Sequence, residues 1–374
     1  MYRSRAVFHS NSIADKLRSF DGWLLLSIFI LGIISIFAQY SSSGGVFDYH
    51  AKSHAIRFFV FFSLFLAVSL VQVNFWHQST FFIYFIFLAL LIAVKYFGLT
   101  SSGSQRWINL YIINLQPSEL MKIGVILFLA KYYHRISSAD VNRLRFLLFP
   151  FAIIMIPFLL VVTQPDLGTS ILILAGGVVV IWLAGVRIKF FAYSLILFVV
   201  TAPIAISFLK PYQKSRILTF LNPDRDPLGA GYQIIQSKIA VGSGGLFGKG
   251  YLNGSQSYLD YLPEKHTDFI FTLFSEEFGF LGSVLILVLY AVITYRIVTI
   301  GNVTRSVFGK LYCYGFSTAF FIYVTVNMCM VLGLLPIVGA PLPILSYGGS
   351  SMLAIMFGLG VAMSCKVYKD SSIS

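Results

Sequence analysis

The side chains best placed to do chemistry are ionisable residues at the ends of long apolar segments. Asp268 is the clearest of these: it lies in LPEKHTDFIF (262–271), with His266 two residues before it. A carboxylate at a water–lipid boundary can take a proton from a substrate hydroxyl if it is ionised and lies within about 3 Å. The alternative is a helix N-cap, since Asp is favoured there and complements the helix dipole. The spacing alone leaves both interpretations open.

Two basic side chains precede another apolar segment. Arg106 stands in GSQRWINL (103–110) beside Trp107, and Lys122 ends QPSELMK (116–122). Guanidinium and ammonium groups at a membrane interface suit a diphosphate, which Arg can bind through two donors. Alternatively, Arg106 is an interfacial charge beside an aromatic residue, and Lys122 pairs with Glu119 at i, i+3. We favour this alternative for Arg106 and a functional role for Lys122.

Three further carboxylates stand near apolar segments. Asp166 in QPDLGT (164–169) comes just before such a segment, which favours a helix N-cap. Glu276 and Glu277 are adjacent and about two turns into a predicted helix, so they point to different faces. We expect at least one of them to face a polar cavity, and the other to be protonated or paired with a basic residue.

Two glycine-rich segments are interpreted as structural. GSGGLFGKG (242–250) lacks the spacer of a phosphate-binding loop, and Gly250 stands where Ser or Thr should follow the lysine. We expect flexible turns with positive φ there. The segment 346–351 (SYGGSS) suits close helix packing at the start of the last apolar run.

The elements that position these residues are long apolar helices. The 374 residues are 57% hydrophobic and 11% charged, against about 25% charged in soluble domains. Runs near the ~20 residues that span a bilayer predict an all-α polytopic membrane protein with ten transmembrane helices in a single domain, 1–374. The runs lie at about 22–40, 55–74, 80–97, 119–133, 146–163, 169–186, 188–209, 269–295, 311–335 and 349–367.

The orientation follows from Lys and Arg in the short connections. With the N-terminus inside, the inner segments hold fifteen of them and the short outer loops hold four, namely Lys52, Arg57, Lys95 and Arg106. Both termini are therefore expected to be cytoplasmic. The long segment at about 210–268 then lies outside, and residues 232–241 are expected to form a short amphipathic helix on the outer leaflet.

Several function classes are disfavoured. The net charge of +13 is spread between apolar runs instead of forming one patch, which argues against nucleic-acid binding. The three cysteines lie in late apolar runs, so neither a disulfide framework nor a cysteine metal site is expected. A proton-coupled transporter would place its acids near the midplane, whereas the acids here are expected near outer helix ends.

The motifs together resemble the SEDS family (shape, elongation, division and sporulation), and its rod-shape members more than its division or sporulation members. The resemblance covers residues 20–367, and Lys249 with the QSKIA segment favours the rod-shape branch. It is carried by RWI (106–108), QPSE with Lys122, QPDLGT, FLNPDRDPLGAGYQIIQSKIAVGSGGLFGKG (220–250), LPEKHTDFIF, EEFGFLG (276–282) and GLLPIVGAPLPILSYGGSS (333–351).

This resemblance implies a peptidoglycan glycosyltransferase of the bacterial inner membrane that uses lipid II. A carbon-4 hydroxyl of N-acetylglucosamine attacks carbon 1 of a lipid-linked N-acetylmuramic acid, and undecaprenyl diphosphate leaves as a β-1,4 link forms. By the same resemblance Asp268 is the catalytic residue, and Arg106, Trp107, Glu119 and Lys122 line the outer substrate cavity.

The resemblance also implies a partner, a class B penicillin-binding protein that cross-links the product. No cofactor is firmly expected. A divalent cation beside the diphosphate fits the chemistry, but the sequence has no ligand cluster to argue for it. The alternatives are a flippase for a lipid-linked precursor, which should carry ionisable groups through the membrane depth, and a scaffold for other wall enzymes.

Overall fold

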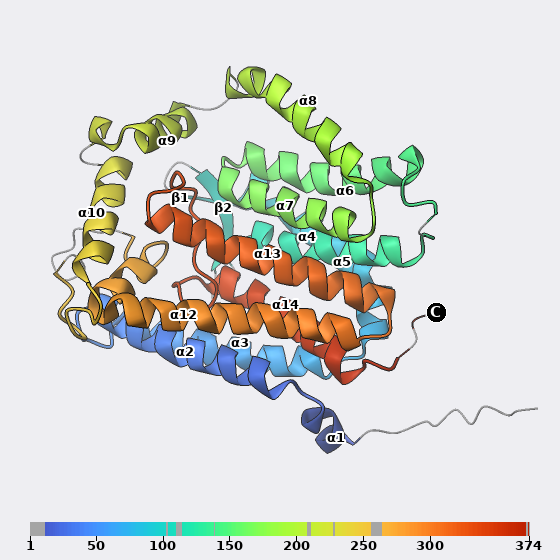
Figure 1. Cartoon of the computed structure of the whole chain (residues 1–374), viewed down its shortest axis with the longest axis horizontal. Coiled ribbons are helices and arrows are strands. Elements are labelled where there is room, and N and C mark those ends of the chain that lie inside the picture. Colours follow the sequence, from blue (N-terminus) through green and yellow to red (C-terminus); the bar gives the residue numbers. More distant parts are fainter. Residues whose placement is uncertain are drawn as a thin grey trace, which may run out of the picture.

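The computed structural model describes residues 12–101, 104–109, 114–137, 139–207, 211–226, 229–255, 264–371 and 373. Within them, each of the ten apolar runs corresponds to an α-helix over most of its length, which confirms the all-α polytopic prediction (Figure 1). The helices are α2 (Gly22–Ser42), α3 (Tyr49–Ser69), α4 (Val73–Phe97), α5 (Pro117–His134), α6 (Leu144–Thr163), α7 (Leu167–Leu183), α8 (Ile188–Ser207), α12 (Ile270–Val303), α13 (Val307–Val331) and α14 (Gly349–Val367).

Seven of these helices are long and apolar enough to cross a membrane by length and composition: α2, α3, α4, α6, α12, α13 and α14. The helix α7 is apolar but has only 17 residues, and α8 contains a shorter apolar stretch. The helix α5 carries Glu119, Lys122 and Lys131, yet it is buried along nearly its whole length. Because neighbouring helices enclose α5, its charges face protein and not lipid.

Several helix boundaries differ from the expected ones. The helix α3 begins at Tyr49 and not near 55, because the Asp48 side chain caps it by accepting from the Ala51 N–H at 2.8 Å. The helix α4 begins at Val73 and not near 80, so its first turns include polar side chains that hydropathy alone excludes. The helix α12 continues to Val303, beyond the expected 295.

The helix α14 is the most enclosed of the seven membrane-spanning candidates, and it packs chiefly against α3. Small residues make this possible: a Cβ on Gly360 would come within 2.6 Å of the Val68 side chain. A Cβ on Gly358 would overlap the Phe316 ring of α13 in the same way. The small-residue start of this run therefore leads into a tightly packed central helix, as predicted.

The helix ends gather into two separate groups, as alternating spans require. At one end, the Tyr347 N–H donates to the His266 carbonyl at 2.8 Å. At the other, the Tyr368 hydroxyl donates to the Leu70 carbonyl at 2.7 Å. The long segment after α8 belongs to the first end, where α9 (Pro211–Leu221) and α10 (Ala230–Ser243) lie, opposite the C-terminus (Figure 1). The 3₁₀ turn η1 (Pro223–Arg225) joins these two helices.

The helix expected at 232–241 is present as α10, and it packs against α12. The Ser237 hydroxyl is buried, contacts the Thr272 hydroxyl at 2.8 Å and donates to the Val331 carbonyl at 2.8 Å. A helix fixed by buried hydrogen bonds to two membrane-spanning candidates is an integral part of the fold.

A small antiparallel sheet at the same end was not predicted. It consists of β1 (Leu99–Ser101), β2 (Ser104–Asn109) and β3 (Asn114–Leu115), in the order β1-β2-β3. Strands of two to six residues leave too little alternating pattern to be recognised against long apolar runs. The sheet matters because β2 carries Arg106.

The glycine run docks against a break in α12. Gly279 has φ 64° inside this helix, and the Phe280 N–H freed by the break donates to the Gly245 carbonyl at 2.9 Å. In return, the Lys249 N–H donates to the Glu276 carbonyl at 3.0 Å. A Cβ on Gly248 (φ 81°) would lie 2.1 Å from a carbonyl oxygen of α12. The positive φ was predicted, but these turns are fixed by backbone contacts and hold a broken membrane helix together.

Candidate active site

Asp268 lies two residues before α12 and does not cap it. The helix begins at Ile270, its N-cap is Phe269, and no side-chain cap bond is made. The capping interpretation of Asp268 is therefore wrong. Its main-chain carbonyl accepts from the Asn327 side chain at 3.0 Å. Among the described residues, no donor contacts its carboxylate, which is left available to a substrate.

The surroundings of Asp268 tune its acidity. The pKa of this carboxyl is raised from its ordinary 3.8 to about 7, chiefly by burial and also by the nearby charges of Glu264 and Asp166. The guanidinium groups of Arg216 and Arg106 lower it, and the cost of burying the charge outweighs them. A carboxylate with a pKa near neutrality is suited to accept a proton and release it again.

Arg106 is held by a buried carboxylate. Its guanidinium lies 3.6 Å from Asp166, which also accepts from the Gln116 amide at 3.0 Å. Asp166 caps α7 as predicted, with the Thr169 N–H at 3.1 Å and the Thr169 hydroxyl at 2.9 Å. Arg106 is only 18% exposed, and its Nε makes no hydrogen bond in the described part of the chain. Arg106 is thus a partly buried cation that is paired with Asp166 and has an Nε without a hydrogen bond to the described residues.

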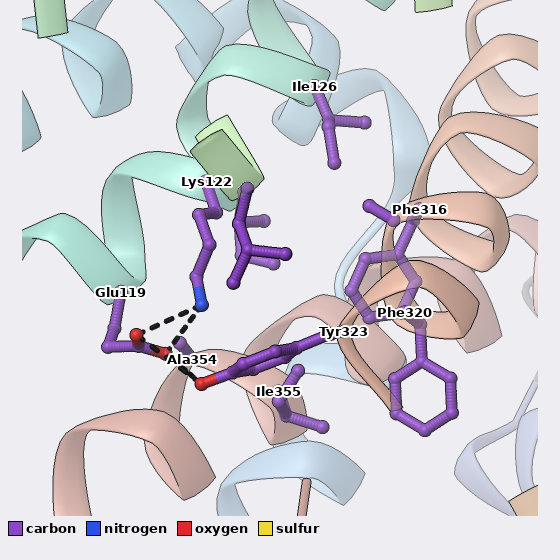
Figure 2. A pocket seen from close by; sticks show the side chains of 11 residues that line it. Glu119, Lys122, Ile126, Phe316, Phe320, Tyr323, Ala354 and Ile355 are labelled. Atoms are coloured by element: carbon purple, nitrogen blue, oxygen red, sulfur yellow. Dashed lines mark hydrogen bonds and ion pairs between the residues drawn. The ribbon is translucent and has the colours of Figure 1, made fainter. Parts of the chain in front are cut away.

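Lys122 and Glu119 form the i, i+3 pair that was one of the two expectations. The ammonium lies 2.9 Å from the carboxylate and 3.8 Å from the centre of the Tyr323 ring. The Tyr323 hydroxyl lies 3.3 Å from the same carboxylate. Figure 2 shows these three groups at one wall of a small pocket, whose other lining is apolar. Such a pocket offers polar groups for a head group beside an apolar wall.

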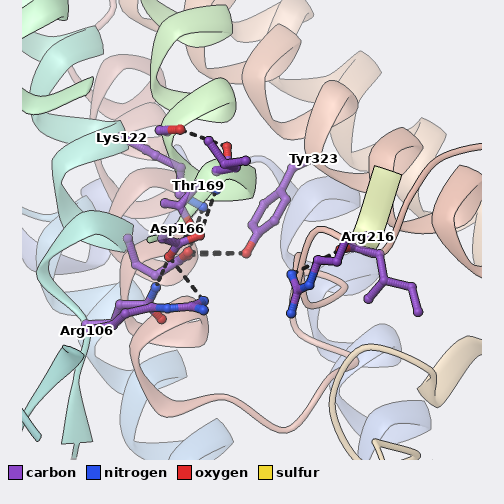
Figure 3. A network of polar contacts seen from close by, with 11 residues as sticks. Arg106, Lys122, Asp166, Thr169, Arg216 and Tyr323 are labelled. Atoms are coloured by element: carbon purple, nitrogen blue, oxygen red, sulfur yellow. Dashed lines mark hydrogen bonds and ion pairs between the residues drawn. The ribbon is translucent and has the colours of Figure 1, made fainter. Parts of the chain in front are cut away.

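Tyr323 connects this pocket to Asp268. Its hydroxyl is within electrostatic range of both Glu119 and Asp268. Arg216 of α9 approaches from the other side and donates to the Ile337 carbonyl at 3.1 Å. Figure 3 shows the guanidinium groups of Arg106 and Arg216 directed toward the space around the Tyr323 hydroxyl. The structure therefore brings Asp268, Arg106 and the Glu119–Lys122 pair to one end of the bundle.

Two members of this group were not identified from the sequence. Tyr323 lies in the apolar run of α13, where a tyrosine is indistinguishable from a core residue. Arg216 lies in the long segment, among other basic residues that have no distinguishing neighbours. Only the tertiary arrangement separates them from the rest of the chain.

Other expected residues lie apart from this site. Trp107 follows Arg106 in β2, and successive strand residues face opposite sides, so the two side chains are expected on opposite faces of the sheet. Glu276 and Glu277 are buried and have separate partners, as expected for adjacent helix residues. Glu276 pairs with Lys249 at 2.6 Å, whereas Glu277 accepts from the Ser41 hydroxyl.

Nothing in the described residues forms a metal site: no group of three or more His, Cys, Asp or Glu side chains could hold an ion there. The acidic residues of the site are engaged instead by organic cations, in the pairs Arg106–Asp166 and Lys122–Glu119. The divalent cation considered from the sequence thus gains no ligand set from this geometry.

The chain is similar to a group of known proteins. Residues 19–371 match the family model FtsW/RodA/SpoVE, described as "Cell cycle protein". It is 44% identical over 290 residues to the peptidoglycan glycosyltransferase MrdB of Escherichia coli K12, covering 77% of this chain and 78% of MrdB. It is 39% identical over 282 residues to the stage V sporulation protein E of Bacillus subtilis, covering 75% and 76% of the two chains.

Solved structures share the fold. One, described as "Structural coordination of polymerization and crosslinking by a peptidoglycan synthase complex", has a TM-score of 0.80 at 28% identity and covers 94% of this chain and 99% of its own. The rod shape determining protein RodA of Thermus thermophilus has a TM-score of 0.71 at 23% identity, covering 94% and 98%.

Proposed function

Because the chain belongs to the FtsW/RodA/SpoVE family of cell cycle proteins, we propose that it is a peptidoglycan glycosyltransferase that polymerises lipid II during cell elongation. One observation carries this proposal: Asp268, whose carboxylate has a pKa of about 7 and no hydrogen-bond donor among the described residues, shares one end of a helical bundle with partly buried cations. The likeness to MrdB, a peptidoglycan glycosyltransferase at 44% identity, supports the same activity.

Asp268 acts as the general base. Its ionised carboxylate takes the proton from the carbon-4 hydroxyl of one N-acetylglucosamine as that oxygen bonds to carbon 1 of a lipid-linked N-acetylmuramic acid. The bond from carbon 1 to the diphosphate oxygen breaks, and undecaprenyl diphosphate carries the electron pair away. The proton then leaves Asp268 for solvent, and the next turnover begins.

The departing diphosphate is stabilised by guanidinium groups. Arg106 has a buried Nε that makes no hydrogen bond to the described residues, and we assign this donor to a phosphate oxygen. Lys122 is already held by Glu119, so its ammonium contributes charge from a fixed position or exchanges partners when substrate arrives. Preorganised donors of this kind cost no rearrangement as charge develops on the leaving group.

The protein lies in the bacterial inner membrane, with both termini in the cytoplasm and Asp268 at the outer face. The excess of Lys and Arg at the opposite end of the bundle supports this orientation. A class B penicillin-binding protein is its partner. The similar structure described as coordinating polymerisation and crosslinking supports such a complex.

The test is polymerisation by the purified full-length protein in detergent with lipid II as the sole substrate. We expect glycan strands on a gel from the wild type and from Asp140→Asn, and none from Asp268→Asn. Asp140 is a matched control, because it is a carboxylate paired with Arg143 at 3.0 Å in a surface loop outside the site. A wild type that makes no strands but moves lipid II across liposomes would be a flippase, and the glycosyltransferase proposal would fail.

A further inference from the structure

The peptide segment that carries Asp268 is held by its main chain. The Thr267 carbonyl accepts from the Ser346 hydroxyl at 2.6 Å. The next carbonyl, that of Asp268 itself, accepts from the Asn327 amide at 3.0 Å. The two donors come from the loop before α14 and from α13, which are remote in sequence from residue 268.

The preceding main-chain carbonyl, that of His266, also accepts hydrogen bonds. His266 O accepts from the Tyr347 N–H at 2.8 Å and from the Gln39 side-chain amide at 2.9 Å. Three consecutive carbonyls therefore meet donors from α2, from α13 and from the 346–347 turn. Consecutive peptide groups fixed from three elements have little freedom to rotate.

Asn327 has the most demanding position in this arrangement. It is fully buried in the middle of the bundle, and its Nδ2 donates to both the Asp268 carbonyl and the Ala340 carbonyl, the latter at 2.6 Å. Its own Oδ1 is buried and makes no hydrogen bond to the described residues. A buried acceptor without a donor costs about 1–3 kcal/mol, so an apolar residue would serve packing better. This energetic cost indicates that the two hydrogen bonds donated by Asn327 Nδ2 have a role beyond packing.

We infer that Asn327 is a positioning residue: it ties the Asp268 main chain to the 332–348 loop and so fixes where the Asp268 carboxylate stands. This inference rests on the proposed function, because it assigns Asn327 a role in that reaction. Ala340, the second acceptor, directly follows Gly339, on which a Cβ would lie 3.8 Å from Asp268 Oδ2. The one amide thus joins the segment that bears the carboxylate to the loop that faces it.

The argument depends on a contrast between side chain and main chain. The Asp268 carboxylate has no protein donor among the described residues, so only its main chain can set its position. A base that is displaced by about an ångström can lose about 10²-fold in rate. Loss of the Asn327 amide is therefore expected to lower the turnover rate, although Asn327 itself does not contact the substrate.

The test compares Asn327→Leu, which has the same branched shape but no donors, with Ser317→Ala. Ser317 is a matched control, because it is buried in the same helix and its hydroxyl donates only within that helix, to Tyr314 O at 3.0 Å. Ser346→Ala, which releases the neighbouring carbonyl, serves as a second variant should Asn327→Leu fail to fold.

Two measurements are made on the full-length protein. Hydrogen–deuterium exchange of the peptide 264–272 is expected to quicken about tenfold or more in Asn327→Leu and not in Ser317→Ala. With lipid II, kcat is expected to fall about 10²-fold with KM nearly unchanged. The pH at which activity falls on the acid side should be lower than the value near 7 expected for the wild type. A loosened segment admits water to Asp268, which lowers its pKa.

If Asn327→Leu keeps the kcat and the pH profile of the wild type, the inference is wrong, even if hydrogen–deuterium exchange becomes faster. Faster exchange throughout the protein would mean that Asn327 merely supports the fold, and would overturn it too. If the wild type makes no polymer, the proposed function fails. The exchange of peptide 264–272 then still decides whether Asn327 holds the Asp268 segment.

Discussion

Replacing Asp268 with Asn should abolish polymerisation and at the same time stabilise the protein. Asn cannot take up the proton, and loss of a general base costs about 10²–10⁴-fold in rate. The fold should not suffer, because Asp268 does not cap α12 and its carboxylate has no donor among the described residues. The main-chain bond from Asn327 is independent of the side chain at 268.

The size of the stabilisation follows from the pKa. A folded-state pKa of about 7 against an ordinary 3.8 corresponds to about 4 kcal/mol if the burial were complete. Asp268 keeps some exposure, and solvent screening reduces this to about 1–2 kcal/mol. For 374 residues, with an unfolding entropy of about 2.1 cal/mol/K per residue, that is an increase in Tm of about 1–3 °C.

The pH dependence gives a sharper check. Because the pKa is raised in the folded state, the wild type loses stability as pH rises from about 4 through about 7, and Asp268→Asn does not. The gap in Tm between the two proteins should therefore be larger at pH 8 than at pH 5. Tm is measured by intrinsic fluorescence in detergent, and strand synthesis is measured with lipid II. A variant that polymerises normally, or that melts below the wild type at pH 8, would refute the reasoning.

Three further predictions concern charge, backbone and orientation. Arg106→Ala should reduce polymerisation at least tenfold, about 1.4 kcal/mol of lost stabilisation, in a strand-synthesis assay. Gly248→Ala should lower Tm by several degrees because its Cβ meets the α12 backbone, whereas Gly22→Ala, with open space around it, should not. In a background without native cysteines, a single cysteine at 255 should react with an impermeant maleimide in intact cells and one at 143 should not. The reverse result would invert the orientation.

The helices were predictable because lipid imposes a simple rule on sequence. Any apolar run of about 20 residues must satisfy its own backbone, and a helix is the only local way to do so. The exception is instructive: α5 carries three charges, and the apolar run that predicts it, 119–133, is the shortest of the ten. Its burial explains why a helix with that composition is stable here.

Within the site, local pairs were accessible to sequence reasoning and distant ones were not. Lys122 and Glu119 share a helix face, and Asp166 precedes a helix, so spacing alone indicated both contacts. The Arg106–Asp166 pair spans sixty residues and depends on an unpredicted sheet. Asp268 resembled a cap because Asp is common before helices. The chain turns once more before α12, however, and Phe269 takes that place.

The cations of the site and the proposed base are held in place in different ways. The cations Arg106 and Lys122 are each held at the side chain by a carboxylate. Asp268 is held at the main chain, and within the described ranges no donor contacts its carboxylate. A paired cation costs little to bury, and its partner can be displaced by a phosphate of higher charge. A base in such a pair would have a lowered pKa and too little affinity for a proton. Main-chain anchoring thus fixes the position of Asp268 without lowering the pKa that its role as a base requires.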